Sequence, residues 1–341
     1  MKWQYLAPKY DRICKILVLG KRIYRCILRL IMASRKTKEV NKSEVKSDVV
    51  SLREDLMVLT KMRLNTFVLI TTLFGYILAS KTVHGVWVAD WWQLFHTILG
   101  TAAVAFGSAA FNQLMEIHQD RQMKRTANRP LPSNRMNVVT AFAIGWVLSA
   151  FGVIHLSAIV GPGSAYLAAI TSVVYVFIYT PMKRKSSANT LVGAIPGAIP
   201  PVIGWVAAGG GWNDGEAWYL FGLLFLWQLP HFVAINWLCR EEYEDAGYKM
   251  WSNGDVSGKK TARLALIFSA CLAALAPVAC LPGIDYASWI FGIGGGLAGI
   301  YMCWLAVKFS RAGSRESSRG LFLFTLLYLP LALGLLAFCW N

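Results

Sequence analysis

The chain has 341 residues, of which 56% are hydrophobic and only 15% are charged, and its mean hydropathy is +0.46. A soluble globular protein of this length carries more charge, so the composition excludes that class. The net charge of +16 does not indicate nucleic-acid binding, because the basic residues lie in loops between apolar runs and form no single basic domain. The sequence therefore predicts an all-α integral membrane protein.

Residues 1–60 differ from the rest and are predicted to form a basic N-terminal extension. Apolar residues recur at helical spacing from Ile16 to Leu30, with basic residues on another face, which indicates an amphipathic helix on an anionic membrane surface. The segment RKTKEVNKSEVKSD that follows is typical of a solvated linker. A mitochondrial transit peptide remains an alternative because acidic residues are scarce, whereas arginines within the apolar run argue against a signal peptide.

Residues 61–341 are predicted to form the membrane domain. Their apolar runs are long enough to cross the hydrocarbon core of a bilayer as helices. Nine spans are expected, at residues 64–80, 92–111, 138–160, 164–180, 190–208, 218–238, 262–281, 286–307 and 320–340.

The loops between these spans alternate between strongly basic and nearly uncharged. Most lysines and arginines follow spans two, four, six and eight, whereas the loops at 161–163, 209–216 and 281–286 are almost free of them. The positive-inside rule then predicts that the N-terminus and the charged loops face the cytoplasm or the mitochondrial matrix. Because the number of spans is odd, the C-terminus is expected on the opposite side.

The first charged segment, NQLMEIHQDRQMKRTANRPLP, covers residues 112–132 and follows the second span. Asn112, Glu116 and Asp120 are four residues apart, which places them on one face of an α-helix. Oxygen ligands of this kind suit Mg²⁺, whose coordination is completed by substrate phosphates and water. Polar residues at the end of a span can also be a simple interfacial cap, but ionisable groups that continue off an apolar span are costly and usually functional.

Basic residues directly follow these carboxylates. They are Arg121, Lys124, Arg125 and Arg129. Such side chains neutralise phosphate oxygens directly. The order of acidic and then basic residues predicts a diphosphate that is held at the membrane rim partly through metal and partly through cations.

The second segment, YTPMKRKSSANTLVGAIPGAIPPVIGW, covers residues 179–205. Lys183 and Arg184 follow the fourth span, and the fifth span contains repeated glycines and prolines between Gly193 and Gly204. Such a helix cannot be regular, because proline removes a backbone hydrogen bond. Irregular backbone at membrane depth usually lines a cavity, although a kinked packing helix would show the same composition.

The third segment, FLWQLPHFVAINWLCREEYEDAGYKMW, covers residues 225–251. His231 lies inside the sixth span, and a mixed acidic and basic cluster follows the end of that span. This cluster consists of Arg240, Glu241, Glu242 and Tyr243. A histidine in an apolar helix often only packs in the core, but two polar clusters at matching depth favour opposite walls of a single site.

These segments resemble the haem-farnesylating branch of the intramembrane, UbiA-type prenyltransferase superfamily, over about residues 55–340. The N-x₃-[DE]-x₃-D element is typical of the superfamily, and the second segment, WQLPHF and REEYEDAGYKM are typical of the haem branch. The resemblance implies nine helices around a central cavity that opens to lipid. It also implies transfer of the farnesyl group of farnesyl diphosphate to a vinyl group of haem B, giving haem O for terminal oxidases.

The resemblance further implies residue roles. Metal binding and catalysis would involve Asn112, Glu116 and Asp120 with Mg²⁺, and Lys124 and Arg125 would join them in catalysis. The diphosphate would be bound by Arg121, Lys124, Arg125, Arg129, Lys183 and Arg184. The second cluster would comprise His231, Arg240, Glu241, Glu242 and Tyr243, with His231 orienting the porphyrin or its propionates, or only packing. This sequence departs from the superfamily pattern at two places. Glu116 stands where the superfamily often has Asp, and CREEYED replaces a second Asp-rich motif, so the resemblance does not establish a second metal site.

Other protein classes share some of these features. A sister prenyltransferase for an aromatic quinone precursor would have Asp-rich residues in place of REEY. A transporter would need ionisable groups towards the outer loops, which are nearly bare, and a phosphatidyl-alcohol transferase would need a DGxxAR signature, which is absent. The expected location is a bacterial inner membrane, with the mitochondrial inner membrane as the alternative. The expected partners are farnesyl diphosphate, haem B, membrane lipid and haem A synthase or terminal oxidase assembly, without nucleic acid.

Overall fold

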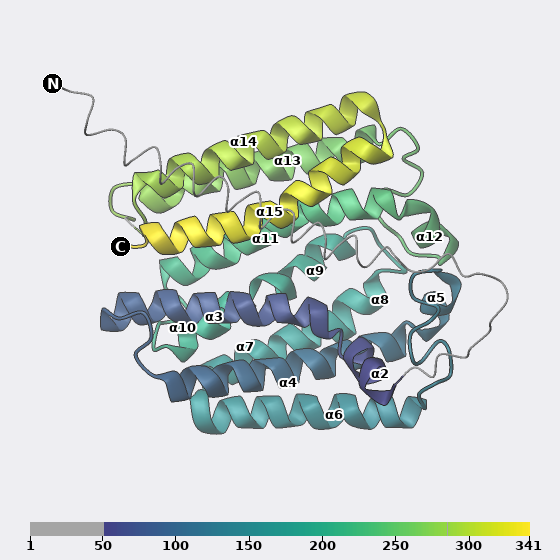
Figure 1. Cartoon of the computed structure of the whole chain (residues 1–341), viewed down its shortest axis with the longest axis horizontal. Helices are drawn as coiled ribbons and strands as arrows, with labels where there is room; N and C mark the ends of the chain where they lie inside the picture. The colour runs from purple at the N-terminus through teal and green to yellow at the C-terminus, as the bar shows by residue number, and fades with distance from the viewer. Residues whose placement is uncertain (1–50, 285) are drawn as a thin grey trace. The chain divides into compact units, whose positions relative to one another are not determined.

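The computed structural model describes residues 51–284 and 286–341, and this part of the chain is helical, with one isolated β-bridge between Ala287 and Trp340 (Figure 1). The amphipathic helix that the sequence predicts around residues 16–30 lies outside the described residues. Residues Ser51–Asn341 form one compact unit.

Nine helical segments of the described residues are long and apolar enough to cross a membrane, which confirms the predicted spans. Five of these segments are single helices: α3 (Met62–His84), α4 (Trp91–Met115), α11 (Gly215–Leu238), α14 (Trp289–Ala312) and α15 (Arg315–Cys339). The others are composite: α6 (Val138–His155) with η1 (Leu156–Val160), α7 (Pro162–Val173) with η2 (Val174–Tyr179) and α8 (Thr180–Met182), α9 (Asn189–Ala198) with α10 (Pro200–Ala207), and α13 (Lys259–Leu275) with η3 (Ala276–Cys280).

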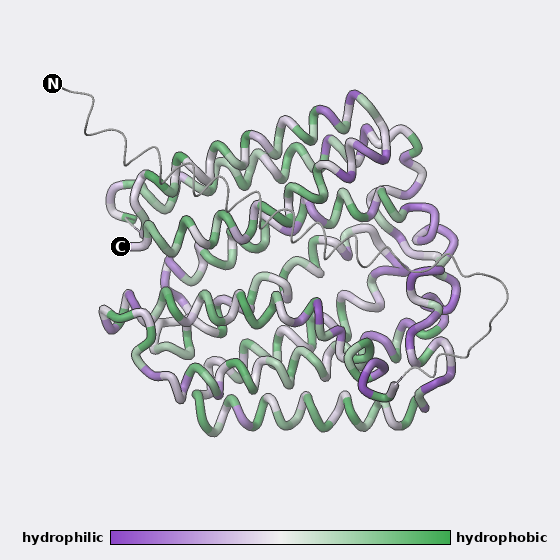
Figure 2. Tube along the Cα trace, viewed as in Figure 1, coloured by the Kyte–Doolittle hydropathy of each residue, from purple (hydrophilic) through white to green (hydrophobic). Residues whose placement is uncertain are grey.

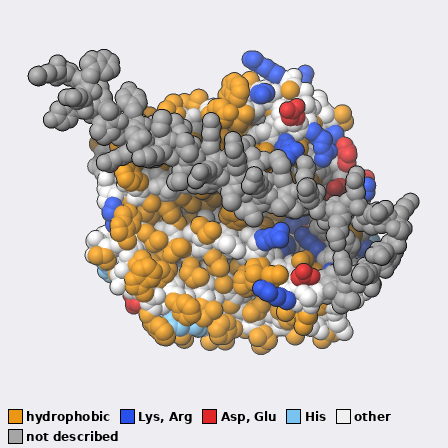
Figure 3. All heavy atoms as spheres, in the orientation of Figure 1, with side chains coloured by type: hydrophobic (Ala, Val, Ile, Leu, Met, Phe, Trp, Pro, Cys, Tyr) orange, Lys and Arg blue, Asp and Glu red, His pale blue; other side chains and the backbone are white. Residues whose placement is uncertain are grey.

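The long helices carry apolar side chains on their outer surface. Trp146, Ile154 and Phe142 remain 61%, 66% and 54% exposed, respectively. Figure 3 shows such side chains spread over one face of the molecule, whereas most lysines and arginines gather towards one end. Exposed apolar area of this extent is rare on soluble monomers. The surface therefore indicates contact with lipid.

Three short helices lie at the hydrophilic end of the bundle: α2 (Leu52–Leu59), α5 (Ile117–Gln122) and α12 (Arg240–Asp245) (Figures 1 and 2). The helix α2 begins with a capping box, in which Ser51 and Glu54 exchange backbone-to-side-chain hydrogen bonds. Its Asp55 is buried and accepts hydrogen bonds from Arg135 at 2.8–3.2 Å. The helix α2, which the sequence assigns to the extension, therefore packs in the same unit as the membrane helices.

The fifth span is interrupted at Ile199, between α9 and α10, as its glycines and prolines predict. The α10 half packs closely against α3. A Cβ atom added to Gly204 would lie 1.9 Å from the carbonyl oxygen of Thr72, and one added to Gly75 would lie 1.9 Å from that of Pro201. Small residues allow two membrane helices to approach at this backbone distance.

Gly204→Ala is therefore expected to destabilise the protein by about 1–3 kcal/mol, because the new methyl group collides with backbone that cannot move aside cheaply. Gly334→Ala on α15 is the matched control, since an added Cβ there meets no atom within 4 Å. The thermal midpoint of each detergent-solubilised variant can be followed by fluorescence-detected size-exclusion chromatography. Equal midpoints for the two variants would show that the α3–α10 contact tolerates a side chain.

Candidate active site

The first predicted motif lies across the joint between α4 and α5. The sequence places Asn112, Glu116 and Asp120 on one face of an α-helix, and in the structure this helix is interrupted at Glu116, which has φ −107° and ψ 7° and separates α4 from α5. The four-residue relation persists nonetheless: the Glu116 amide donates to the Asn112 carbonyl at 3.2 Å, and the Asp120 amide donates to the Glu116 carbonyl at 2.8 Å. The side chains of Asn112, Glu116 and Asp120 are all buried.

Both buried carboxylates of this motif form ion pairs with basic residues. Lys183, which follows α8, donates to Glu116 Oε1 at 2.7 Å, and Arg129 donates to Asp120 Oδ2 at 2.6 Å. A buried carboxylate without such a partner would be strongly unfavourable. These contacts bring the first and second predicted segments into one site, although they are far apart in the sequence.

Lys61 is a third basic residue of the site, and sequence reasoning missed it. It precedes α3 in a left-handed conformation, with φ 48°. Its Nζ donates to Asn112 Oδ1 at 2.5 Å and to the Tyr175 hydroxyl at 3.2 Å, while Asn112 Nδ2 donates to the Thr180 hydroxyl at 2.9 Å. A lysine just before an apolar span usually marks only orientation, so no local signal distinguished this one.

We refer to these six residues as the charged cluster. Its members are Lys61, Asn112, Glu116, Asp120, Arg129 and Lys183. Three basic side chains face two carboxylates and one amide, so the charged cluster has an excess of positive charge when all its ionisable groups are charged. An excess of this sign in a buried place favours an anionic ligand.

Burial and mutual attraction shift the pKa values within the charged cluster. Burial lowers the pKa of Lys61 to about 7, with Glu116 opposing the shift. Burial alone would raise the pKa of Glu116, but the charges of Lys183 and Lys61 outweigh it and hold that pKa below its usual value. Burial raises the pKa of Asp120, against the attraction of Arg129. Strong desolvation opposed by nearby charges, as in these three groups, is typical of functional sites.

Four of the basic residues predicted to bind diphosphate lie outside the charged cluster: Arg121, Lys124, Arg125 and Arg184. Arg121 is exposed and donates to the Pro132 carbonyl at 3.1 Å and to Asn134 Oδ1 at 3.2 Å. Lys124, Arg125 and Arg184 are also exposed. Their part in diphosphate binding stays a prediction, while Lys183 and Arg129 already contact the carboxylates.

The segment after α5 meets the third predicted segment at α12. The Arg125 guanidinium lies 4.9 Å from the centre of the Tyr243 ring, and its Nε is 3.9 Å from Glu242 Oε2. Met123 packs with Tyr243 and Tyr248 in one apolar cluster. These contacts make the two charged segments neighbours on the same side of the bundle.

The residues of the predicted second cluster make their contacts in two different places. Arg240 pairs with Glu241 at 3.1 Å and lies over the Trp237 ring, and Glu241 is exposed. His231 is instead packed between aromatic side chains, with its Nδ1 2.9 Å from the Thr325 hydroxyl. His231 thus contacts α15, whereas Glu242 and Tyr243 contact Arg125 of the first segment, and their shared role stays a prediction.

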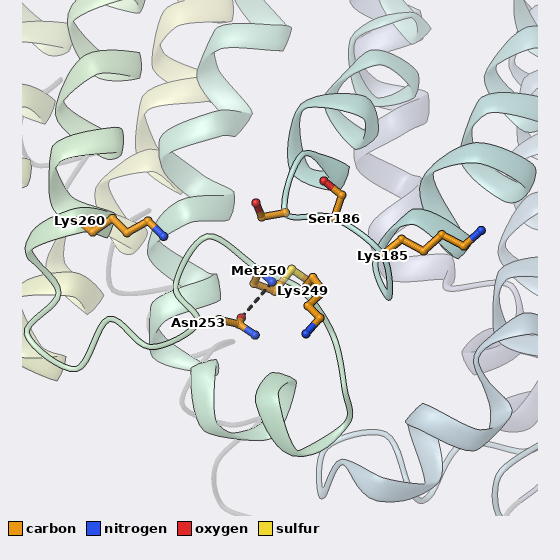
Figure 4. A pocket seen from close by; sticks show the side chains of 7 residues that line it. Lys185, Ser186, Lys249, Met250, Asn253 and Lys260 are labelled. Atoms are coloured by element: carbon orange, nitrogen blue, oxygen red, sulfur yellow. Dashed lines mark hydrogen bonds between the residues drawn. The ribbon is translucent and has the colours of Figure 1, made fainter.

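A basic pocket of about 350 Å³ adjoins the segment that carries Lys183 (Figure 4). It is lined by Lys185, Ser186, Ser187, Lys249, Met250, Asn253 and Lys260, with no acidic residue. The Lys249 amide donates to the Lys183 carbonyl at 2.7 Å, and Asn189 Nδ2 donates to the Lys249 carbonyl at 2.6 Å. The pocket therefore gathers Lys185, Lys249 and Lys260 next to the segment that carries Lys183, and clustered positive charge of this kind attracts anions.

Mg²⁺ fits the charged cluster by the chemistry of its ligands. Asn112, Glu116 and Asp120 offer one amide and two carboxylate donors, and each already faces a cationic group. Within residues 51–284 and 286–341, no three His, Cys, Asp or Glu side chains gather closely enough to hold a metal alone. A site of this composition suits Mg²⁺ that takes its remaining ligands from substrate phosphates and water.

Comparison with known proteins shows which family this chain resembles. The model of the UbiA prenyltransferase family matches residues 68–339. The protein named protoheme IX farnesyltransferase from Solibacter usitatus is 40% identical, over 83% of this chain and 97% of its own. The mitochondrial protoheme IX farnesyltransferase of Homo sapiens is 36% identical, over 91% of this chain and 68% of its own.

Two solved structures share the fold. A structure of digeranylgeranylglyceryl phosphate synthase aligns with a TM-score of 0.69 and 16% identity, covering 84% of this chain and 98% of that chain. A UbiA homologue from Archaeoglobus fulgidus bound to GPP and Mg²⁺ aligns with a TM-score of 0.56 and 12% identity, over 83% of this chain and 99% of that chain. At these identities the likeness establishes the helical architecture alone.

Proposed function

Because this chain belongs to the UbiA prenyltransferase family, we propose that it transfers the farnesyl group of farnesyl diphosphate to a vinyl group of haem B, making haem O. The observation that carries the proposal is the buried charged cluster, in which Lys183 and Arg129 pair with Glu116 and Asp120. The names of the curated relatives support farnesyl as the donor group and haem as the acceptor.

In this proposal the basic residues of the charged cluster stabilise the leaving group. Lys61, Arg129 and Lys183 exchange carboxylate or amide oxygens for oxygens of the diphosphate. Negative charge develops on the diphosphate as the allylic C–O bond breaks, and preorganised buried cations stabilise it more than water does. Mg²⁺, when held by the oxygens of Asn112, Glu116 and Asp120, would add Lewis-acid neutralisation of the same charge.

Two tyrosines beside the charged cluster suit the farnesyl cation. The rings of Tyr175 and Tyr179 stack with centres 5.6 Å apart, and Lys183 Nζ lies 4.6 Å from the centre of the Tyr179 ring. A ring that already faces a cation can stabilise an allylic cation through its π electrons. The vinyl electrons of haem B then form the new C–C bond, and water adds to the resulting porphyrin-stabilised cation with loss of a proton. The reaction consumes one water and releases diphosphate.

The proposed location is a bacterial inner membrane, with the charged end and the N-terminus on the cytoplasmic side and the C-terminus opposite. The basic loops and bacterial relatives support this arrangement, and the mitochondrial relative supports the inner mitochondrial membrane as the alternative. Residues 61–341 would carry the activity. Haem A synthase or terminal oxidase assembly would consume the haem O.

Haem O synthesis tests the proposal directly. Membranes that contain this protein are incubated with haem B, farnesyl diphosphate and Mg²⁺, and the haems are separated by reversed-phase chromatography. Haem O is expected to accumulate over time, and replacing haem B by an aromatic quinone precursor is expected to give no prenylated product. Haem O no higher than in membranes without the protein would overturn the proposal.

Metal removal is expected to abolish this activity. Excess EDTA should reduce haem O formation to background, because the charged cluster relies on substrate-bound Mg²⁺ to complete the neutralisation of the leaving group. Readdition of Mg²⁺ should restore the rate, whereas Ca²⁺, which prefers larger coordination shells, should restore less of it. Full activity in EDTA would contradict a metal role for Asn112, Glu116 and Asp120.

A further inference from the structure

Nδ1 of His231, on α11, forms a hydrogen bond with the Thr325 hydroxyl, and the donor of this bond can be deduced. The Thr325 hydroxyl lies 2.6 Å from the Phe322 carbonyl, to which it donates its only proton. His231 Nδ1 lies 2.9 Å from the same hydroxyl oxygen. Because the hydroxyl proton is already used, Nδ1 must carry the hydrogen and donate it, so the neutral ring has its lone pair on Nε2.

Neighbouring aromatic side chains hold the plane of this ring. The His231 ring stacks on Phe322 with centres 4.8 Å apart and on Trp227 with centres 5.6 Å apart. Trp227 Nε1 in turn donates to the Thr325 carbonyl at 2.7 Å. The helices α11 and α15 thus fix both the tautomer and the orientation of the imidazole.

His231 Nε2 is open, in contrast to the corresponding atom of another histidine in a span. Among the described residues Nε2 of His231 has no hydrogen-bond partner, and the side chain is only half-buried. His96 Nε2 is enclosed by protein, and its Nδ1 lies 2.9 Å from His155 Nε2. A lone-pair nitrogen that is oriented, free and accessible is available to a metal or a proton donor.

The position of His231 on α11 places it between two neighbouring helices. Trp227, one turn earlier, bonds to α15, and Gln228 beside it donates to the Ala194 carbonyl of α9 at 2.8 Å. His231 therefore lies on the side of α11 between α9 and α15, whereas Tyr219, three turns earlier, bonds to the Ala276 carbonyl of η3.

We infer that His231 Nε2 is an axial ligand of the iron of the acceptor haem, and that it positions the vinyl group relative to the charged cluster. Histidines that bind metals characteristically donate their other ring nitrogen to an acceptor, which fixes the tautomer and raises the basicity of the ligating nitrogen. Aromatic and apolar surroundings suit the porphyrin faces. The identity of the ligand as an iron porphyrin rests on the proposed function, and the iron itself is not a reactant.

Spectroscopy of bound haem tests this inference without turnover. The purified full-length protein, in lipid nanodiscs, is titrated with haem B, reduced, and examined by resonance Raman spectroscopy for an iron–histidine stretching band. We expect the band in the wild-type protein and its loss in His231→Ala, with recovery when imidazole is added. His155→Ala, a histidine in another span, is the matched control and should keep the wild-type band.

The Thr325→Val variant separates ligation from packing. Valine nearly preserves the shape of threonine but cannot accept the proton of Nδ1, so the iron–histidine band should remain and move to lower frequency. Haem affinity should fall by about tenfold, as for other losses of a partner to a metal-binding histidine. An unchanged band in Thr325→Val would contradict the deduced hydrogen bond, and an unchanged band in His231→Ala would overturn the inference.

Wild-type haem O synthesis, measured in parallel, distinguishes this inference from the proposed function. Haem O formation without histidine-ligated haem in the wild-type protein would overturn the inference and leave the function standing. Histidine-ligated haem that depends on His231, without any haem O, would overturn the function and leave the ligation standing. If both hold, His231→Ala should raise the KM for haem B at least about tenfold and leave the KM for farnesyl diphosphate unchanged.

Discussion

Asp120→Asn is expected to reduce haem O formation by about 10²- to 10³-fold while the protein stays folded and inserted. Asparagine keeps the shape of the side chain but removes the charge that, in the proposed function, binds Mg²⁺ and that neutralises Arg129, which lies 2.6 Å away. Losses of this order follow removal of one preorganised electrostatic group from other active sites. The rate of haem O formation per folded molecule, at saturating Mg²⁺, is the measurement.

Asp55→Asn is the matched control for this experiment. Asp55 is also a buried carboxylate paired with an arginine, Arg135 at 2.8 Å, and it belongs to the same unit but not to the charged cluster. The Asp55→Asn substitution should lower thermal stability, because Arg135 loses its charge partner. The rate of haem O formation per folded molecule should stay near the wild-type value. Equal losses of activity in the two variants would assign Asp120 a structural role only.

Lys61→Met is expected to lower kcat/KM for farnesyl diphosphate by about 100-fold. The substitution removes one of the three cations of the charged cluster and leaves Asn112 Oδ1 without the donor that lies 2.5 Å away. Removal of one preorganised group that stabilises developing charge has an effect of this size. Steady-state kinetics with each substrate varied in turn should place the loss on farnesyl diphosphate, with the KM for haem B little changed.

Arg63→Met provides the control for Lys61→Met. Arg63 lies two residues further along the chain, at the same end of α3, and its side chain is exposed. Both substitutions remove one positive charge from the same membrane boundary, so both alter the orientation signal equally. Activity that falls alike in the two variants would attribute the effect to insertion and would remove Lys61 from the site.

The membrane helices could be predicted because their signal is local. Each apolar run in the sequence is long enough to span the hydrocarbon core, and loop charge separates one run from the next. The interruption near Ile199 was predictable for the same reason, since glycine and proline act at their own positions. The break at Glu116 was not, because no proline or glycine marks it and the backbone hydrogen bonds on either side keep helical spacing.

The pairings within the charged cluster depend on distant segments and were not predictable in detail. Spacing singled out Asn112, Glu116 and Asp120, but Lys61 and Lys183 reach them from 51 and 67 positions away in the sequence. Among several neighbouring cations, only tertiary packing decides which one becomes buried. The residue types of the site could therefore be read from the sequence, whereas the choice between Lys183 and Arg184 could not.

The ion pairs of Lys183 and Arg129 have a consequence for product release. In the proposed reaction, a site that binds diphosphate tightly as the C–O bond breaks must later let it go. Two partly buried cations left without any counter-ion would oppose that departure, because a charge removed from water is unfavourable without a partner. Glu116 and Asp120, which lie within 2.7 Å of these cations, would take the place of the departing anion. Turnover can thus proceed by exchange of one set of oxygens for another, with the cations neutralised at each stage.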